Sequence, residues 1–414
     1  MMKIIQIFLI TILLGSCMDF QDENDDREIQ QPEYIKWEIE LPNDEVFITV
    51  HNPMVNDDLV IIPVDNQGVI LALDKASGEE VWRWKEARDT YDGADGFGMW
   101  NYIYDDILMV GQNNILYAID VNSGSTLWHE RNELSSNNNF FGHEGMVGIN
   151  FRIPNEMISY QLLDVQTSEL KEVVEFNRED IYNMSGNGSV LYSYNDKTYM
   201  AFVQKKWLSS ENGYEEYGWL YNYNITDEQL EWVSDTIPKN SPILHVPGHP
   251  YIQRGKIVLA SNSIQAYDIE SGYLDWIDQT HTNTFTWSTG LTAANGKVFG
   301  NNENGYMIAL DVDTGAELWR TDTGGTGSRI EYYDEKLYIS QITGYFIKDE
   351  NRYADGSSLL VLDANNGEIL HHLEAPYQTP DNHQYWDDVI TVDQETGLIY
   401  TADHNKVMCI ELED

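Results

Sequence analysis

Asp311 and Asp313, followed by Gly315, have the spacing with which a calcium-binding loop begins. Carboxylate oxygens are the ligands that a hard cation such as Ca²⁺ prefers, and Asp-x-Asp-x-Gly can bring several of them to one ion. The third acidic ligand and the distal glutamate of such a loop are missing from this sequence. We therefore interpret the segment as a tight turn in which an Asp carboxylate accepts backbone N–H groups.

Histidine is the other common metal ligand, and the spacing of His245 and His249 would suit a metal site. Pro and Gly between them indicate a loop, and His371, His372 and His383 also lie around a turn-rich stretch. Because no Cys and no His-Glu-x-x-His pattern accompanies them, the sequence predicts no metal site. It also lacks a Gly-rich phosphate loop and a Gly-x-Ser-x-Gly elbow, so we expect no enzyme.

Cysteine chemistry is limited to two residues, and Cys17 has an informative context. It follows Leu14-Gly15-Ser16 at the end of an apolar run that begins after Lys3. This arrangement resembles the bacterial lipobox, which implies that the peptide before Cys17 is removed and that its thiol is diacylated. Acyl chains of this kind would anchor the protein to a membrane. The alternative is an ordinary secretory signal that happens to contain a Cys.

The elements that position these residues repeat along the chain. An apolar alternation, typical of a half-buried strand, ends in Asp; a Gly turn and then a Trp follow. Ala lies two residues before the Asp, Gly four after it and Trp eight after it. Neighbouring copies are 46 residues (Asp74 to Asp120) or 43 residues (Asp268 to Asp311) apart, which is typical of a four-stranded propeller blade.

Four weaker copies are centred on Asp164, Asn224, Asp363 and Glu411. The last copy stops before its final strand, and the missing Trp strand is found near the other terminus, around Trp37. The sequence therefore predicts an all-β fold, an eight-bladed β-propeller of four-stranded antiparallel blades closed by N- and C-terminal strands. Closure of this kind removes an exposed sheet edge. Seven blades are the alternative, if the copy at Asp164 is an elaborated connection.

The Trp of each copy is expected to be structural. Its large apolar face can lie against the small Ala of the sheet, while the indole N–H donates to a carbonyl. Cys409 holds the Ala position before Glu411, so we expect a small buried core residue and not a nucleophile. The predicted docking residues are Trp37, Trp82, Trp128, Trp232, Trp276 and Trp319.

The motif Ala-x-Asp-x-x-Thr/Ser-Gly-x-x-x-Trp resembles the tryptophan-docking repeat of the pyrroloquinoline-quinone-like β-propeller family. Within that family, the chain resembles non-catalytic, lipid-anchored members related to the outer-membrane assembly factor BamB. The resemblance implies a monomeric protein-binding scaffold in the bacterial cell envelope, anchored to the outer membrane and facing the periplasm or the cell surface. The family's alcohol dehydrogenases carry an adjacent Cys-Cys disulfide that this chain lacks. We therefore expect no cofactor, and a quinone-dependent oxidoreductase is the second alternative.

Charge and composition divide the chain and limit its partners. We expect a lipoprotein signal peptide at 1–16, an acidic disordered tether at 17–33 and the propeller at 34–414. The net charge of −45 would repel nucleic acid and anionic membrane surfaces, so neither is an expected partner of the domain. The partner is therefore expected to be an envelope protein or, as the first alternative, a glycan, with membrane contact only through the lipid.

Two blades are longer than the rest, since 60 residues separate Asp164 from Asn224 and 52 separate Asp311 from Asp363. The insertions, 204–219 and 343–358, precede the Asp-bearing strand and lengthen the loop between the second and third strands. Loops at that position emerge on one face of a propeller. Aromatic residues among charges on such loops often bind partners, although self-packing of a long hairpin is the alternative. The candidate partner-binding residues are Trp207, Tyr214, Tyr217, Tyr345, Phe346 and Tyr353.

Overall fold

A computed structural model gives the fold, which lies in one compact unit, Pro32–Asp414. Every regular element that the structure describes is a β-strand. The described residues therefore contain no helix that could span a membrane. The expected lipidation site Cys17 and the tether lie outside the described residues. These are residues 31–41, 52–64, 68–85, 102–112, 115–131, 140–152, 157–177, 183–210, 213–239, 244, 246, 248–278, 291–302, 305–324, 326–327, 329–342, 345–348, 351–354, 357–376, 389–402 and 406–413.

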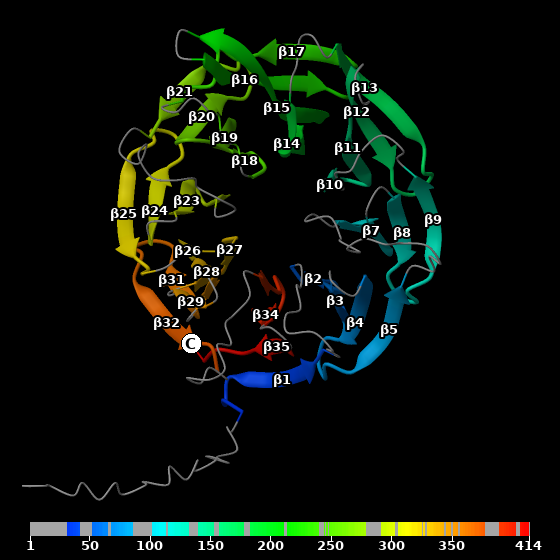
Figure 1. Ribbon diagram of the computed structural model, residues 1–414, viewed down its shortest axis with the longest axis vertical. Coiled ribbons are helices and arrows are strands. Elements are labelled where there is room, and N and C mark those ends of the chain that lie inside the picture. Colours follow the sequence, from blue (N-terminus) through cyan, green and yellow to red (C-terminus); the bar gives the residue numbers. More distant parts are fainter. Residues whose placement is uncertain are drawn as a thin grey trace, which may run out of the picture. The chain divides into compact units, whose positions relative to one another are not determined.

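Eight antiparallel sheets follow one another around a ring, with the first strand of each nearest the centre (Figure 1). The prediction of eight blades is confirmed, and the copy at Asp164 is a blade of its own and not a connection. The first and second blades comprise β2 (Met54–Val55), β3 (Leu59–Val64), β4 (Val69–Asp74), β5 (Glu80–Lys85), β6 (Tyr102–Tyr104), β7 (Ile107–Gln112), β8 (Ile115–Asp120) and β9 (Thr126–Arg131).

The third to sixth blades have the same strand order, each strand paired with the next along the chain. The third comprises β10 (Phe140–His143), β11 (Met146–Arg152), β12 (Met157–Asp164) and β13 (Leu170–Asn177). The fourth comprises β14 (Asn183–Tyr194), β15 (Lys197–Ser210), β16 (Gly213–Asn224) and β17 (Gln229–Val233). The fifth and sixth comprise β18 (Tyr251–Gln253), β19 (Lys256–Ala260), β20 (Ile264–Asp268), β21 (Leu274–Ile277), β22 (Leu291–Ala294), β23 (Lys297–Asn302), β24 (Tyr306–Asp311) and β25 (Glu317–Asp322).

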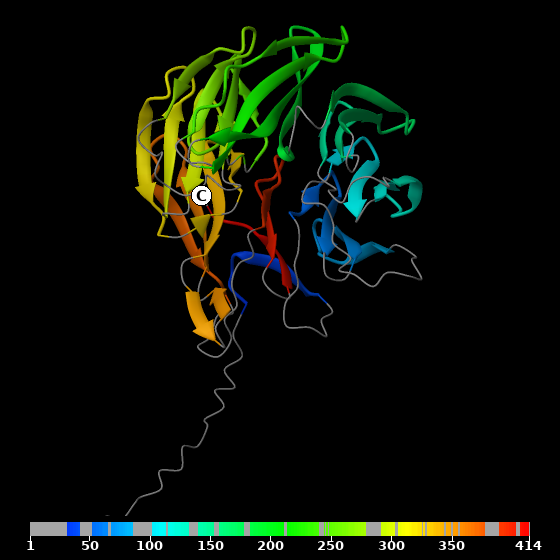
Figure 2. The same cartoon turned by 45° about the horizontal axis from the view of Figure 1, so that its top comes forward.

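The seventh blade carries an additional hairpin between its second and third strands. Its inner strand is split into β26 (Thr326–Gly327) and β27 (Glu331–Tyr333), which both pair with β28 (Lys336–Ile342). The blade continues with β31 (Ser357–Asp363) and β32 (Ile369–Glu374). The hairpin, β29 (Tyr345–Lys348) and β30 (Asn351–Ala354), forms a separate two-stranded sheet that projects from the ring (Figure 2).

The eighth blade joins the two ends of the unit, as predicted. It consists of β33 (Ile390–Val392), β34 (Ile399–Ala402), β35 (Lys406–Ile410) and β1 (Ile35–Glu40), in the order β1-β35-β34-β33. Trp37 lies opposite Cys409 in the antiparallel β1–β35 pair. Lys406 also forms an ion pair with Glu38, with 2.6 Å between Nζ and Oε1. Strand pairing between residues far apart in sequence therefore closes the ring.

Burial in the third strand of a blade exceeds what the alternation predicted. Both faces of β4 are buried, because each blade is packed between two others. Leu71 and Leu73 belong to the cluster shared with the eighth blade, whereas Ile70 and Ala72 belong to the one shared with the second. The expectation of a half-buried strand was therefore wrong: the period of two assigns residues to two interfaces and not to core and solvent.

The turn that follows this strand explains the Asp and Gly of the repeat. The N–H and the hydroxyl of Ser77 donate to Oδ1 of Asp74 at 2.8 and 2.7 Å. Gly78 donates its N–H to the Asp74 carbonyl at 2.8 Å and has a φ of +74°. This backbone conformation favours glycine, so the spacing of Asp and Gly follows from the geometry of the turn.

Candidate functional site

The six tryptophans predicted to dock lie at the seams, by which we mean the interfaces between successive blades. Each indole N–H donates to a main-chain carbonyl of the next blade, always that of the residue after the repeat's Asp position. These bonds run from Trp37 to Lys75 (3.1 Å), Trp82 to Val121 (2.7 Å), Trp128 to Val165 (3.2 Å), Trp232 to Ile269 (3.0 Å), Trp276 to Val312 (2.8 Å) and Trp319 to Ala364 (3.2 Å).

Five of the six docking rings, all except that of Trp128, also lie against the glycine turn of the next blade. A Cβ added to Gly315 would stand 2.6 Å from Cδ2 of Trp276, so the ring occupies the space that any side chain there would need. The Ala of the repeat is the cross-strand neighbour within the same blade, as in the pair Ala266 and Trp276. The sequence predicted this Ala, but it did not predict that the tryptophan joins two blades.

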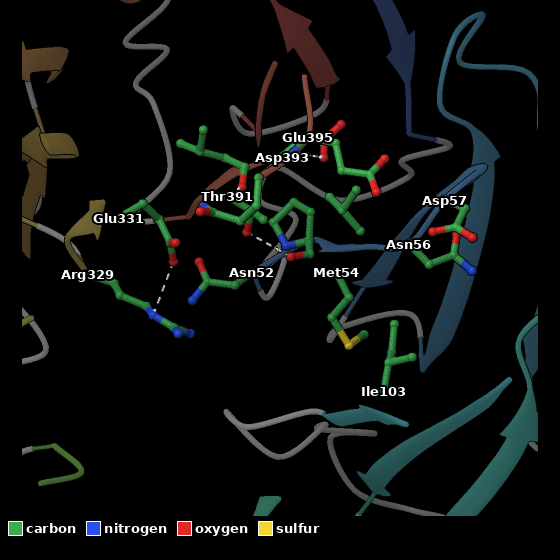
Figure 3. A pocket seen from close by; sticks show the side chains of 14 residues that line it. Asn52, Met54, Asn56, Asp57, Ile103, Arg329, Glu331, Thr391, Asp393 and Glu395 are labelled. Carbon is green, nitrogen blue, oxygen red and sulfur yellow. Dashed lines mark hydrogen bonds and ion pairs between the residues drawn. The ribbon is translucent and has the colours of Figure 1, made fainter. Parts of the chain in front are cut away.

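A cavity of about 440 Å³ lies at the inner ends of several blades (Figure 3). It opens between the first strands of the first and eighth blades, which are joined beside it by the Thr391 hydroxyl, a donor to the Pro53 carbonyl at 2.7 Å. Its lining includes Asn52, Met54, Asn56 and Asp57 of the first blade, Ile103 of the second, Arg329 and Glu331 of the seventh, and Thr391, Asp393 and Glu395 of the eighth.

Two ion pairs lie at this cavity. Arg329 Nε lies 3.3 Å from Oε1 of Glu331, and Lys75 Nζ lies 2.8 Å from Oδ2 of Asp393. Burial raises the pKa of Glu331, and the guanidinium of Arg329 opposes that shift. Burial also acts to raise the pKa of Asp393, but hydrogen bonds from Lys75 and Thr396 outweigh it and leave the pKa below its usual value.

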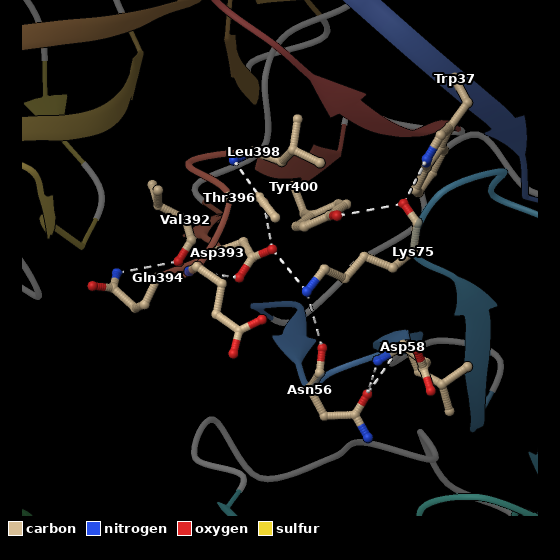
Figure 4. A network of polar contacts seen from close by, with 12 residues as sticks. Trp37, Asn56, Asp58, Lys75, Val392, Asp393, Gln394, Thr396, Leu398 and Tyr400 are labelled. Atoms are coloured by element: carbon tan, nitrogen blue, oxygen red, sulfur yellow. Dashed lines mark hydrogen bonds and ion pairs between the residues drawn. The ribbon is translucent and has the colours of Figure 1, made fainter.

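Lys75 connects the cavity to the closure of the ring (Figure 4). Its ammonium also donates to the Asn56 carbonyl at 3.3 Å, and its own carbonyl accepts the N–H of Trp37 and the hydroxyl of Tyr400. Side chains of Asp, Glu, Asn and Thr dominate the rest of the wall. The cavity is therefore suited to bind cationic or amide groups, and some of its polar side chains, such as Thr391 and Asp393, also hold blades together.

Sequence reasoning missed this cavity because its residues come from first strands and the segments on either side of them, which the repeat leaves unspecified. One signal was available. Asp393-Gln-Glu-Thr396-Gly397 repeats the Asp-x-x-Thr-Gly turn of the other blades, but between the first and second strands. Gly397 donates to the Asp393 carbonyl at 2.8 Å, as the repeat turns do. A turn motif out of register with the repeat would have indicated a special position.

The first predicted binding insertion is a long hairpin formed by the outer halves of β15 and β16. Tyr217 is half-buried there: Lys239 Nζ lies 4.3 Å from its ring centre, and its hydroxyl donates to Glu215 at 3.1 Å. Tyr217 is thus partly covered by its own chain. The backbones of Trp207 and Tyr214 lie in β15 and β16, those of Tyr345 and Phe346 in β29, and that of Tyr353 in β30, with side chains outside the described residues.

A buried ion pair supports the base of this hairpin. Glu216 accepts the N–H of Leu244 at 3.1 Å, and Lys205 donates to the Leu244 carbonyl at 2.8 Å, with 3.8 Å between the two charged groups. Burial lowers the pKa of Lys205, and the Glu216 carboxylate opposes that shift. Because Leu244 lies between β17 and β18, the connection to the fifth blade holds the hairpin in place. Removal of either charge would leave the other buried and unpaired.

Among the residues weighed as metal ligands, those that the structure describes do not form a metal site. The Asp311 carboxylate accepts hydrogen bonds from the N–H and the hydroxyl of Thr314 at 2.9 and 2.7 Å. The bond from the hydroxyl is the main cause of the lowered pKa of Asp311. His249 contacts the Ser189 carbonyl, and burial lowers its pKa to about 4. His371 and His372 lie on β32, while His245 and His383 lie outside the described residues. Within the described ranges, no group of three His, Cys, Asp or Glu is placed to hold a metal.

The quinone cofactor after which the fold family is named is a polycarboxylate, so cationic groups would have to hold it. Around the cavity, Asp57, Glu331, Asp393 and Glu395 outnumber Arg329, which is already paired with Glu331. The described side chains of this cavity therefore do not match the charge of the cofactor.

Comparisons with known proteins agree with the fold. The family model described as outer membrane protein assembly factor BamB matches residues 33–142 and 260–384. No curated protein sequence matches the chain significantly. Among solved structures, BamB from Moraxella catarrhalis is 15% identical, with a TM-score of 0.58 over 92% of this chain and 97% of that one. The quinohemoprotein alcohol dehydrogenase of Comamonas testosteroni is 12% identical, with a TM-score of 0.60 over 91% and 76%. A computationally designed protein, Ika8, is 12% identical, with a TM-score of 0.60 over 90% and 98%.

Proposed function

The chain belongs to the family described as outer membrane protein assembly factor BamB, and from this premise we propose that it is a non-catalytic scaffold of the bacterial cell envelope. In this proposal the signal peptide 1–16 is removed, Cys17 carries the lipid, and residues 17–33 tether the propeller to the outer membrane. The protein acts by binding another envelope protein, and the family description points to the assembly of outer-membrane proteins as the process it serves.

One observation carries the proposal: the hairpin of β15 and β16 extends beyond its blade, and Lys205 and Glu216 at its base both form hydrogen bonds with Leu244. A buried ion pair at the base of a loop stabilises one orientation, which reduces the entropy that binding would otherwise cost. The β29–β30 hairpin also joins the second and third strands of its blade, so topology places both hairpins on the same face. We assign partner binding to this face.

The test shortens both hairpins and keeps the blades intact. Replacing 208–215 by Asn-Gly, with Trp207→Thr, retains the pair formed by residues 207 and 216 and hence the support of Glu216. Replacing 343–356 by Asn-Gly joins Ile342 and Ser357, which already lie opposite each other. The matched control is Asp196→Gly, which changes the β14–β15 turn on the opposite face.

The readout is in-cell crosslinking of the lipoprotein, followed by identification of the attached proteins. We expect wild type and Asp196→Gly to be crosslinked to components of the outer-membrane assembly machinery, and the shortened protein to lose them. Cys17→Ser should abolish incorporation of labelled fatty acid. Equal crosslinking by the shortened protein would contradict the assignment of this face. Crosslinks confined to polysaccharide-uptake proteins would favour the glycan alternative, and dye reduction after addition of pyrroloquinoline quinone and Ca²⁺ would favour the oxidoreductase.

A further inference from the structure

One seam differs from those that hold a docking tryptophan. Between the seventh and eighth blades, the position eight residues after Asp363 is occupied by His371. Val361, and not Ala, lies opposite it in the β31–β32 pair. Among the described residues, none supplies an indole at the docking position of this seam.

A cleft of about 220 Å³ lies at this seam. Tyr333, Tyr338 and His371 of the seventh blade line one side of it, and Gly397 and Leu412 of the eighth blade line the other. Leu412 follows Glu411, the last copy's Asp position, so its carbonyl corresponds to the six carbonyls that accept an indole N–H elsewhere. The cleft thus lies where the other seams hold a tryptophan.

Absence of the tryptophan alone does not distinguish this seam. The third blade also lacks it, but the seam to the fourth blade is filled by a cluster that includes Phe141, Tyr160 and Phe202. What distinguishes the seventh seam is the split eighth blade. There the glycine turn between third and fourth strands is replaced by two separate chain segments, one leaving β35 and one entering β1. In the neighbouring seam, by contrast, Gly367 lies against Trp319.

The charges around the cleft are mainly negative. Asp334, Glu411 and Glu413 line it together with Lys336. Lys36 forms an ion pair with Glu411, with 3.1 Å between Nζ and Oε2. Two tyrosine rings in the wall offer aromatic contact, and an acidic rim attracts basic residues.

We propose that this cleft is a docking site for one tryptophan side chain of a partner protein, flanked there by basic residues. The six intramolecular seams supply the geometry: an indole between two blades whose N–H donates to the carbonyl after the Asp position. The acidic rim supplies the preference for basic flanks. The site lies on the face of the Asp-Gly turns, opposite the two hairpins, and does not depend on the partner assigned to that other face.

The probe is the peptide Lys-Trp-Lys with a 5-fluoroindole, titrated with the propeller and followed by ¹⁹F NMR; Lys-Leu-Lys is the competitor control. We expect saturable binding by wild type and at least a tenfold loss in the double variant Val361→Ala, His371→Trp, whose own indole would fill the cleft. The matched control Leu370→Trp places an indole on the exposed side of the same strand, where Leu370 is 41% exposed, and should bind as wild type does.

A surface substitution keeps the test independent of repacking. Glu413→Lys reverses a charge at an exposed position and should weaken Lys-Trp-Lys severalfold, while binding of Ala-Trp-Ala changes little. No saturable binding to wild type would overturn the proposal. So would equal binding by the double variant, or displacement by Lys-Leu-Lys as effective as by the unlabelled Trp peptide.

Discussion

Replacing Gly315 by Ala tests whether the docking tryptophans hold the blades together. A Cβ at Gly315 would stand 2.6 Å from Cδ2 and Cε3 of Trp276, and the φ of this glycine is +71°. The substitution therefore acts in two ways: it strains the backbone, and it displaces the ring. Gly324 separates the two effects, because its φ is +77° and a Cβ there would meet nothing within 4 Å.

The expected magnitude follows from these contacts. A left-handed backbone costs a residue with a Cβ roughly 1–2 kcal/mol. Displacing the ring weakens the 2.8 Å hydrogen bond from Trp276 to the Val312 carbonyl. Such a bond contributes about 1 kcal/mol, and full truncation of a buried aromatic costs roughly 3–5 kcal/mol. We therefore expect Gly315→Ala to lower the free energy of unfolding by about 2–4 kcal/mol, and Gly324→Ala by about 1–2 kcal/mol.

The third blade supplies the reverse experiment. Ser168 holds the position that Gly315 holds in the sixth blade, and its φ is +57°. Ser168→Gly should remove roughly 1–2 kcal/mol of backbone strain. Glycine adds about 0.4–1 kcal/mol of entropy to the unfolded chain, so we expect a net stabilisation near 1 kcal/mol.

The assay is unfolding in urea, in which the midpoint reports stability and the slope reports the surface exposed. The urea concentration at the midpoint should be highest for Ser168→Gly and should then decrease in the order wild type, Gly324→Ala, Gly315→Ala. Equal midpoints for the two glycine variants would refute the idea that contact between ring and turn stabilises the seam. A lower midpoint for Ser168→Gly would refute the account of the turn.

Three further outcomes are expected. Deleting 18–30 should leave the melting temperature nearly unchanged, whereas deleting 18–42 removes β1 with its docking tryptophan and should lower it strongly; calorimetry of both proteins checks this. The folded pKa of Asp393 is depressed, so its stabilisation is present above the unfolded value near ~4 and is lost as pH falls through the folded value. Asp393→Asn should therefore flatten the decline of melting temperature between neutral and acid pH. Burial raises the pKa of the Cys409 thiol to about 12, so iodoacetamide at pH 8 should label it only after unfolding.

The fold could be predicted well from the sequence because the repeat motif spans two paired strands and the turn that joins them. The Asp, Gly and Trp spacings reflect a turn and the strands on either side of it, so eight centres indicated eight blades. The split last copy indicated closure through Trp37 and Cys409, which the β1–β35 pair confirms. Contacts between blades were harder to predict from the sequence. Trp82 and Val121, for example, are 39 residues apart, and no local sequence pattern relates them.

The candidate sites could not be predicted in the same way. The support of the long hairpin depends on Lys205, Glu216 and Leu244, three ordinary residues on different elements. The cavity of about 440 Å³ depends on first strands and the segments beside them, whose sequences differ from blade to blade. Only the composition of the insertions indicated binding, and for Tyr217 the structure shows a ring partly covered by Lys239.

The division of labour within the repeat explains where recognition can arise. The Asp carboxylate of a regular blade is engaged by its own turn, as Ser77 engages Asp74, and the indole N–H is engaged by the next blade. Regular blades therefore retain few polar groups of the motif for a ligand. Departures from the repeat release such groups or add new ones: the two hairpins extend one face, and His371 with the split eighth blade opens a cleft on the other. A propeller of this kind can thus change partners by altering insertions and seams while the stabilising contacts of its regular blades stay unchanged.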